Sequence, residues 1–241
     1  MKKLTVILAL LLLVGCQTTR VSSDTEMVVF EQAWTKESVG LEITNLNSGM
    51  NNDNAVTIIH AEDIKVEAEI NKDLLDHGFR IELVGDEIII TTDNRKQFSN
   101  LNLDIVVYAP VDSIEIEGAF VVKYDRPQTR SLDVELDGAG SFELTQIDNE
   151  RVDIDVDGAG SFKLSGKTNE LEVNLDGAGS IEAFDLVAER VTVELDGAGS
   201  VEVTANSLLD AELSGLGSIV YRGNPQVNKE IDGLGSISAD Q

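Results

Sequence analysis

Apolar and polar residues alternate strictly along the second half of the chain, from about residue 113 onward. Four equivalent segments each carry three aliphatic residues separated by polar ones, and each ends on an Asp. They are residues 132–137, 152–157, 171–176 and 191–196. A period of two is typical of strands with one buried and one wet face. A shorter alternating segment follows each of them, as in Phe142-Glu143-Leu144. The pattern predicts paired strands and no sustained helix.

The stretch 27–112 is less regular but still strand-like. Asn-rich residues 45–54 predict an exposed loop, and a helix of one or two turns is compatible with residues 71–77. Strand candidates lie at residues 56–60, 64–70, 81–83, 87–92 and 101–107.

A glycine corner separates the two strands of each regular unit. Asp-Gly-Ala-Gly-Ser begins at residues 137, 157, 176 and 196, and related corners begin at residues 214 and 232. The first glycines, counted from Gly118, recur every 18 to 20 residues. That unit is shorter than a propeller blade of about 40 residues or a βαβ unit of about 30. We therefore predict an all-β fold, a right-handed parallel β-helix or β-solenoid with coils of about 18–20 residues; the hand follows the general preference of parallel crossovers.

The corner glycines are predicted to be structural, because a tight corner uses backbone conformations that a Cβ forbids. On this basis we expect Gly158→Val to destabilise the solenoid more than Gly166→Val. The set comprises Gly138, Gly140, Gly158, Gly160, Gly177, Gly179, Gly197, Gly199, Gly215, Gly217, Gly233 and Gly235.

The first residues predict export and lipidation. Met1-Lys2-Lys3 precede an apolar run at residues 4–14, which is shorter than the roughly 20 residues that span a bilayer. Leu13-Val14-Gly15-Cys16 is similar to the bacterial lipobox, and Cys16 is the lone cysteine; a plain secretory signal is the alternative. We expect a lipoprotein signal peptide at 1–15, a lipidated tether at 16–26 and one β-solenoid domain at 27–241. Gln17 after the cysteine favours sorting to the outer membrane, on either face.

Net charge narrows the choice of partners. The chain has 44 acidic and 18 basic residues, a formal net charge of −26, which repels nucleic acid and anionic membrane surfaces. The predicted partners are the membrane, through the lipid anchor, and a glycan or envelope protein; nucleic acid is excluded.

One row of acidic residues raises the question of a cation. Asp137, Asp157, Asp176 and Asp196 share one phase of the repeat. Stacked, they could bind Ca²⁺, which takes six to eight oxygen ligands. The interpretation we favour is that each carboxylate accepts hydrogen bonds from the corner amides while the row blocks edge-to-edge aggregation.

Support for catalysis is lacking in the residue pattern. His60 and His77 lie outside the repeats, and Trp34 is the lone tryptophan, so neither a metal set nor an aromatic sugar platform is evident. The repeat faces also lack clusters of arginine. A serine follows each corner, but a nucleophile needs a single strained elbow and a nearby base. We expect a hydroxyl ladder of Ser141, Ser161, Ser180, Ser200, Ser218 and Ser236, and no enzyme activity or cofactor.

The repeats, together with residues 85–90, 106–110 and 221–225, resemble a bacterial family, the auto-transporter adhesin head GIN domain, whose function is unknown. The similarity covers residues 27–238. It implies a β-helical body that is usually exported and often lipid-anchored, and it supplies no catalytic residues. Aspartate at the corner, where many members have serine, is a departure.

Together these observations predict a non-enzymatic outer-membrane lipoprotein that acts as an adhesin or a scaffolding module of the cell envelope. Two alternatives stay open. One is a glycan-binding or glycan-cleaving β-helix protein, and the other is a calcium-dependent envelope module.

Overall fold

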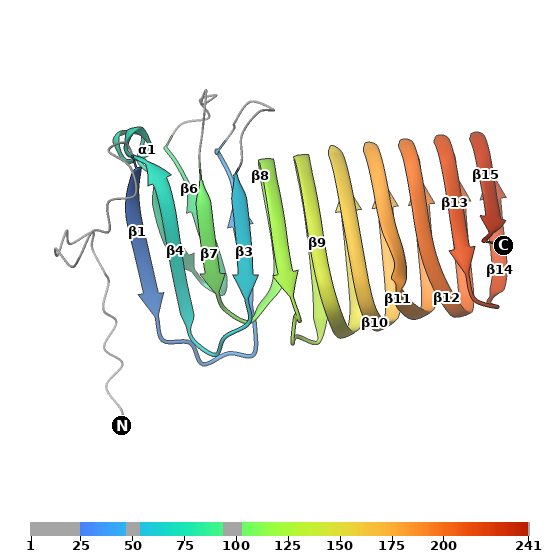
Figure 1. Ribbon diagram of the computed structural model, residues 1–241, viewed down its shortest axis with the longest axis horizontal. Coiled ribbons are helices and arrows are strands. Elements are labelled where there is room, and N and C mark those ends of the chain that lie inside the picture. The colour runs from blue at the N-terminus through green and yellow to red at the C-terminus, as the bar shows by residue number, and fades with distance from the viewer. Residues whose placement is uncertain (1–24, 47–53, 94–102, 241) are drawn as a thin grey trace.

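The computed structural model describes residues 25–46, 54–93 and 103–240. All of its strands belong to one sheet, which winds along the long axis of the molecule (Figure 1). The predicted signal peptide, Cys16 and most of the predicted tether lie outside the described residues, as does the middle of the Asn-rich loop. The first strand begins at Thr25, two residues before the expected start of the folded body.

The N-terminal region contains seven strands and one short helix. In chain order they are β1 (Thr25–Gln32), β2 (Val39–Ile43), β3 (Ala55–Ile59), β4 (Ile64–Asn71), α1 (Lys72–Asp76), β5 (Arg80–Val84), β6 (Glu87–Thr91) and β7 (Asp104–Tyr108). The helix and the strand candidates between residues 56 and 107 are thereby confirmed, although residues 101–102 of the last candidate lie outside the described residues. β1 and β2 lie in the stretch expected to be strand-like, but neither was predicted as an individual strand.

Pairing in the N-terminal region departs from a simple stack of parallel coils. β1 pairs antiparallel with β4, and β4 pairs antiparallel with β7. β5 and β6 also form an antiparallel pair. β3 then pairs parallel with both β7 and β8 (Val111–Asp125), which brings the sheet into the regular repeats. The stack of parallel coils thus begins behind an end built partly from reversed strands.

From β8 onward the chain forms the predicted solenoid. The remaining strands are β9 (Ser131–Val156), β10 (Ala159–Leu175), β11 (Ala178–Leu195), β12 (Ala198–Leu213), β13 (Leu216–Arg222), β14 (Gln226–Ile231) and β15 (Leu234–Ala239). Each pairs parallel with the equivalent part of the preceding coil. The corners lie in register, since Ala139 pairs with Ala119 and Ala159, and Leu234 with Leu216. Coil length and parallel stacking are both confirmed.

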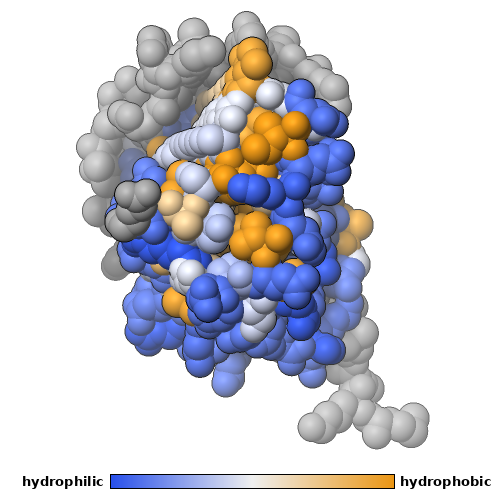
Figure 2. All heavy atoms as spheres, turned by 90° about the vertical axis from the view of Figure 1, so that its right-hand side faces the viewer, coloured by the Kyte–Doolittle hydropathy of each residue, from blue (hydrophilic) through white to orange (hydrophobic). Residues whose placement is uncertain are grey.

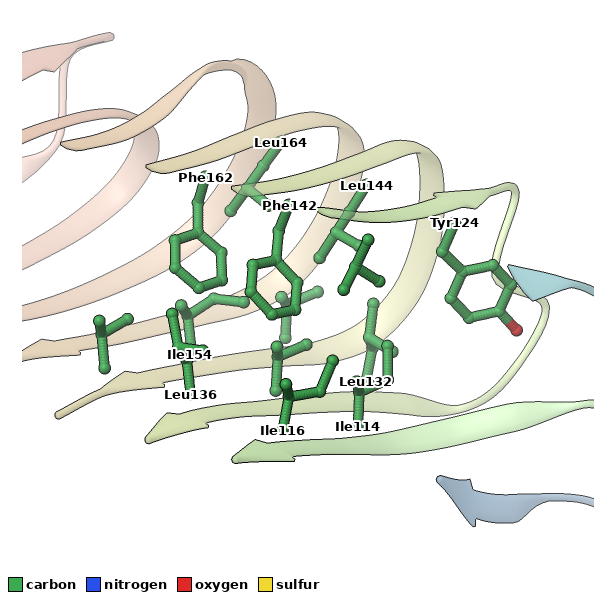
Figure 3. Packing of buried hydrophobic residues seen from close by; sticks show 14 of the residues in the cluster. Ile114, Ile116, Tyr124, Leu132, Leu136, Phe142, Leu144, Ile154, Phe162 and Leu164 are labelled. Atoms are coloured by element: carbon green, nitrogen blue, oxygen red, sulfur yellow. The ribbon is translucent and has the colours of Figure 1, made fainter. Parts of the chain in front are cut away.

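Aliphatic side chains from successive coils fill the interior in rows (Figure 3). Phe142 and Phe162 occupy the same place in adjacent coils, and their rings stack with centroids 4.5 Å apart and planes 4° apart. In the next coils Ile181 and Val201 take this position in the register. At the N-terminal side Tyr124 is buried, and its hydroxyl donates to the carbonyl oxygen of Val111 at 3.1 Å.

The corner glycines are required by close backbone approach more than by an unusual conformation. A Cβ added to Gly158 would overlap the carbonyl oxygen of Gly138, and one on Gly177 would overlap that of Gly158. Neither residue has a positive φ. The sequence-based reason holds for Gly138 and Gly217, whose φ values are 153° and 158°, but needs correction for the other corner glycines. There the coils stack through the space that a side chain would occupy.

The structure also removes the basis for the comparison expected between Gly158 and Gly166. Gly166 lies at the opposite corner, has a φ of 127° and would place a Cβ against the carbonyl oxygen of Ile147. Both positions exclude side chains, so valine at Gly166 cannot serve as the mild substitution.

Among the described residues, no helix is long and apolar enough to cross a membrane.

Candidate functional site

One broad face of the solenoid carries carboxylates on its outer side. We call it the acidic face. Its residues lie at outward positions of the strand segments that lead into the glycine corners, and they include Glu42, Glu115, Asp133, Glu135, Asp153, Asp155 and Glu194. Glu115 lies in register between Glu42 and Glu135. Partial burial, followed by the charges of Glu135, Glu42, Glu87 and Glu117, raises the pKa of Glu115. The face holds negative charges closer together than they would lie in the unfolded chain.

Burial and neighbouring negative charges also raise the pKa of other carboxyl groups on the acidic face. The pKa of Asp155 is raised by partial burial and then by the charges of Asp157, Asp153 and Asp176. The pKa of Asp133 is raised by burial and by Asp153, against the opposing charge of Arg151. Like charges on neighbouring strands repel, so this face is a region of electrostatic strain.

The corner aspartates form the predicted row but do not cap the corner amides. Asp137, Asp157, Asp176 and Asp196 are exposed. The amide groups of Asp176 and Gly177 both donate to the carbonyl oxygen of Val156, at 3.1 and 3.2 Å. The same arrangement recurs in the next coils. The corner amides therefore pair with the backbone of the preceding coil, and the interpretation in which the carboxylates accept them is wrong.

No group of three or more His, Cys, Asp or Glu side chains within residues 25–46, 54–93 and 103–240 is arranged to hold a metal ion. Calcium binding by the aspartate row stays a prediction.

The serines after the corners form the expected hydroxyl ladder. Ser161 pairs with Ser141 and Ser180, and the row continues through Ser200 and Ser218 to Ser236. His60 lies in the connection between β3 and β4, and His77 directly follows α1. The structure therefore places both histidines in the N-terminal region, apart from the serine-bearing coils.

A row of arginines lies along the second corner of the coils, where the sequence had suggested no cluster. A shallow hollow of about 480 Å³ is bordered by residues of three successive coils: Arg130, Ser131, Glu150, Arg151, Asn169, Glu170 and Arg190. We call this surface the arginine row. Its lining holds three arginines and two glutamates, and Arg151 also forms ion pairs with Asp153 and Glu172 beside the hollow, so the surface is rich in arginine with each guanidinium set against a carboxylate.

Cross-strand ion pairs organise the arginine row. Arg130 pairs with Glu150 at 2.8 Å, and Arg151 pairs with Glu172 at 2.7 Å. Glu170 lies in register between Arg151 and Arg190 and forms an ion pair with Arg190. Hydrogen bonding and the charge of Arg190 lower the pKa of Glu170. All of these charged groups are at least partly exposed, so they are accessible to a ligand.

The arginine row was missed because it does not share the phase of the glycine corner. Arg151 and Arg190 are two coils apart, with Glu170 between them. The intervening coils differ by one residue in length, and the register shifts between Leu164 and Gly166. A second alignment centred on these charged residues would have revealed their shared position.

Fold and surfaces together define an extended all-β repeat protein that presents long regular faces and shallow polar hollows. The chain belongs to the family described as "Putative auto-transporter adhesin, head GIN domain", whose sequence profile matches residues 49–225. Among curated proteins, none matches this sequence. The family membership expected from the corners and the residues around them is confirmed.

Solved structures share the fold at low sequence identity. A putative adhesin from Bacteroides fragilis is 18% identical, with a TM-score of 0.71 over 89% of this chain and 97% of its own. A putative adhesin from Parabacteroides distasonis is 17% identical, with a TM-score of 0.63 over 89% and 97%. A third structure, described as a putative lipid binding protein from the same organism, is 18% identical, with a TM-score of 0.56 over 91% and 98%. These similarities establish the architecture.

Proposed function

We propose that the protein is a non-enzymatic lipoprotein of the outer membrane whose solenoid provides an adhesive or scaffolding surface in the cell envelope. The observation that carries the proposal is the stacked architecture: coils in register place equivalent outward positions in rows along the faces, as the serine row shows. Such faces suit extended contacts with a repetitive partner. Membership in an adhesin family agrees with this role.

Attachment to the membrane is assigned to Cys16. The basic start, the apolar run and the lipobox-like segment support lipidation, and an acyl chain contributes about 0.8 kcal/mol per buried methylene. Cys16→Ala should release the protein from the membrane fraction and abolish the mass added by acylation. Retention of Cys16→Ala in that fraction, with unchanged mass, would contradict lipid anchoring at this residue.

Within this role, the arginine row is the surface we assign to glycan binding. Guanidinium, carboxylate and amide groups converge on it from successive coils, and these groups hydrogen-bond to hydroxyl and acidic groups of sugars. None of its lining residues is aromatic. The surface therefore suits a heavily hydroxylated polysaccharide lying across the coils, recognised through polar contacts.

Variants of the arginine row test this assignment. The double variant Arg151→Gln and Arg190→Gln should weaken glycan binding at least about tenfold, as expected for loss of charge-assisted hydrogen bonds. Glu135→Gln and Glu194→Gln together form the matched control, because they change two charges on the acidic face. Equal binding by both double variants would place the glycan elsewhere.

A glycan array run with and without Ca²⁺ separates the proposed function from its alternatives. Binding without turnover supports the adhesive module, whereas shortened glycans indicate a glycan-cleaving enzyme. Binding that requires Ca²⁺ indicates the calcium-dependent module and should be accompanied by calorimetric heat on Ca²⁺ titration. Loss of that heat on neutralising Asp157 and Asp176 would assign the cation to the corner row.

A further inference from the structure

The C-terminal end of the solenoid exposes edges that a further coil could cover. Among the described strands, β14 pairs with β12 alone, and β15 pairs with β13 alone. Each therefore leaves one row of backbone donors and acceptors unpaired, which is a template for strand addition. Figure 2 looks onto this end and shows apolar residues gathered within a hydrophilic border.

An apolar position that is buried in the preceding coil becomes exposed at this end. Ile231 is 42% exposed, whereas Leu213, its partner in the preceding coil, is fully buried. The corner position is exposed in earlier coils as well, where it holds alanine, but at this end it holds larger apolar side chains: Leu216 is 55% exposed and Leu234 is 76% exposed. Exposed apolar residues beside unpaired strand edges favour association with another chain.

Lys229 interrupts an interior row at this end. The equivalent inward positions of earlier coils are aliphatic or small: Val134, Ile154, Val173, Val193 and Ala211. Lys229 follows Ala211 in register. Its amino group donates to the carbonyl oxygen of Ile237 on β15, at 3.3 Å, and so reaches from one wall of the last coil to the other. A lysine thus lies across the open end of the apolar interior.

We propose that Lys229 closes the C-terminal end of the solenoid and prevents it from pairing with the same end of a second copy. Covering this end would bury an ammonium group, which is costly without a compensating anion. Inward-pointing charges and lysines are known devices by which sheet edges avoid pairing. The expected occupant, once the charge is removed, is a second copy, because identical ends related by a two-fold axis present identical edges to each other and form a closed dimer.

Self-pairing is favoured over a head-to-tail filament by the difference between the two ends. At the N-terminal end, β1 and β4 run antiparallel, so that end does not present the parallel coil that β14 and β15 would extend. The predicted product of removing the charge is therefore a dimer and not a growing fibre.

The test is the oligomeric state of the full-length protein in mild detergent, measured by size-exclusion chromatography with light scattering and analytical ultracentrifugation. Wild type should be monomeric, whereas Lys229→Val should lower the dimer dissociation constant at least about tenfold. Dimerisation of Lys229→Val should strengthen from about 0.15 M to about 0.5 M salt, because the salt screens the repulsion between the two acidic molecules. Lys163→Val is the matched control, since it removes an exposed lysine from a side face.

A variant that reverses the charge separates the effect of burying a charge from that of the side chain's shape. Lys229→Glu should stay monomeric, because a carboxylate is equally costly to bury. Circular dichroism and thermal melting should show that every variant is folded. A monomeric Lys229→Val protein, a dimeric wild type, or association of Lys229→Glu to the same degree as Lys229→Val would each overturn the proposal.

Discussion

Gly158 shows how a single hydrogen atom in place of a side chain allows two coils to stack. The backbone carbonyl of Gly138 lies in the space that a Cβ on Gly158 would need, while the amide of Ala178 donates to the carbonyl of Gly158 at 2.8 Å. Coil-to-coil hydrogen bonding at the corner thus depends on an absent side chain. The constraint repeats at Gly177 and Gly197.

Gly158→Ala should destabilise the protein by about 1–3 kcal/mol or more, because the neighbouring backbone must move to admit the methyl group. Gly40→Ala is the matched control, since the nearest atoms to its added Cβ lie at ordinary distances, 3.6 Å away. Urea denaturation of both variants measures the difference. Equal free energies of unfolding would contradict the close-approach explanation.

Glu115 makes the acidic face sensitive to pH. Its pKa is raised in the folded protein, so folding is favoured when the group is protonated, and this contribution is lost as pH rises above about 4 toward neutrality. Glu115→Gln should therefore melt higher than wild type at pH 7, with the gap closing near pH 4. Thermal melts over this pH range provide the measurement.

Glu170→Gln offers a control of opposite sign. Its pKa is lowered by Arg190, so its contribution is present above the ordinary carboxyl pKa and is lost on acidification. This variant should melt at or below the wild-type temperature at pH 7. A rise equal to that of Glu115→Gln would show that loss of negative charge alone, and not its position, determines stability.

Individual residues also show what the sequence could and could not predict. The alternation in residues 152–157 fixed which side chains point inward, and the recurrence of Gly-x-Gly-Ser fixed the coil length. The pattern alone could not predict that the corner amides beside Asp176 donate to the carbonyl oxygen of Val156 and not to the Asp176 carboxylate, because that depends on the distance between coils. Nor could it predict the proposed role of Lys229, because that role depends on the contact between Lys229 and Ile237 in the last coil.

At the scale of elements, the repeat predicted the coil length but not the long strands β9 to β12, because each of them joins the short strand expected after a corner to the strand that leads into the next corner. Nor did the sequence pattern predict β1 and β2 as individual strands. β1 has apolar residues on both sides: Val28 and Phe30 pack against the core, while Met27 and Val29 are exposed. Because apolar and polar residues do not alternate in β1, the sequence pattern did not predict this strand. Alternation is also the same for parallel and antiparallel strands, so the reversed pairing of β1 with β4 could not be predicted.

The ion pairs between coils should contribute little to stability. Glu170 and Arg190 belong to adjacent strands and are both exposed, and water and salt screen such pairs strongly, so their net contribution to stability is small. A double-mutant cycle with Glu170→Gln and Arg190→Gln should give a small coupling energy that decreases in high salt. A large coupling energy that persists in high salt would identify the arginine row as a structural element and weaken its assignment to ligand binding.

At the scale of the whole molecule, each coil contacts its neighbours and the ends have neighbours on one side. Stability in such a stack is a sum of coil and interface contributions, and it is lowest at an uncovered end. Hydrogen exchange should therefore be slowest in the amides of β10 and β11 and fastest, among the regular strands, in β14 and β15. Uniform protection along the coils would contradict this description.

The proposed function fits the order of the lipid anchor, the N-terminal end and the stacked coils along the molecule. A lipid at Cys16 would hold the N-terminal end at the membrane, and the flat faces and the arginine row would extend away from it along the coils. The acidic surface would keep neighbouring molecules apart, since the chain carries a formal net charge of −26. Adhesion or scaffolding requires accessible, repeated contacts of this kind.

The most direct measurement incubates the protein with the glycan that the array selects and follows both retention and glycan mass over time. The account predicts that the glycan is retained with unchanged mass and that the Arg151→Gln and Arg190→Gln double variant loses retention. Glycan fragments in the wild-type reaction would contradict the non-enzymatic role. Failure of the folded wild-type protein to retain the glycan would contradict the adhesive role.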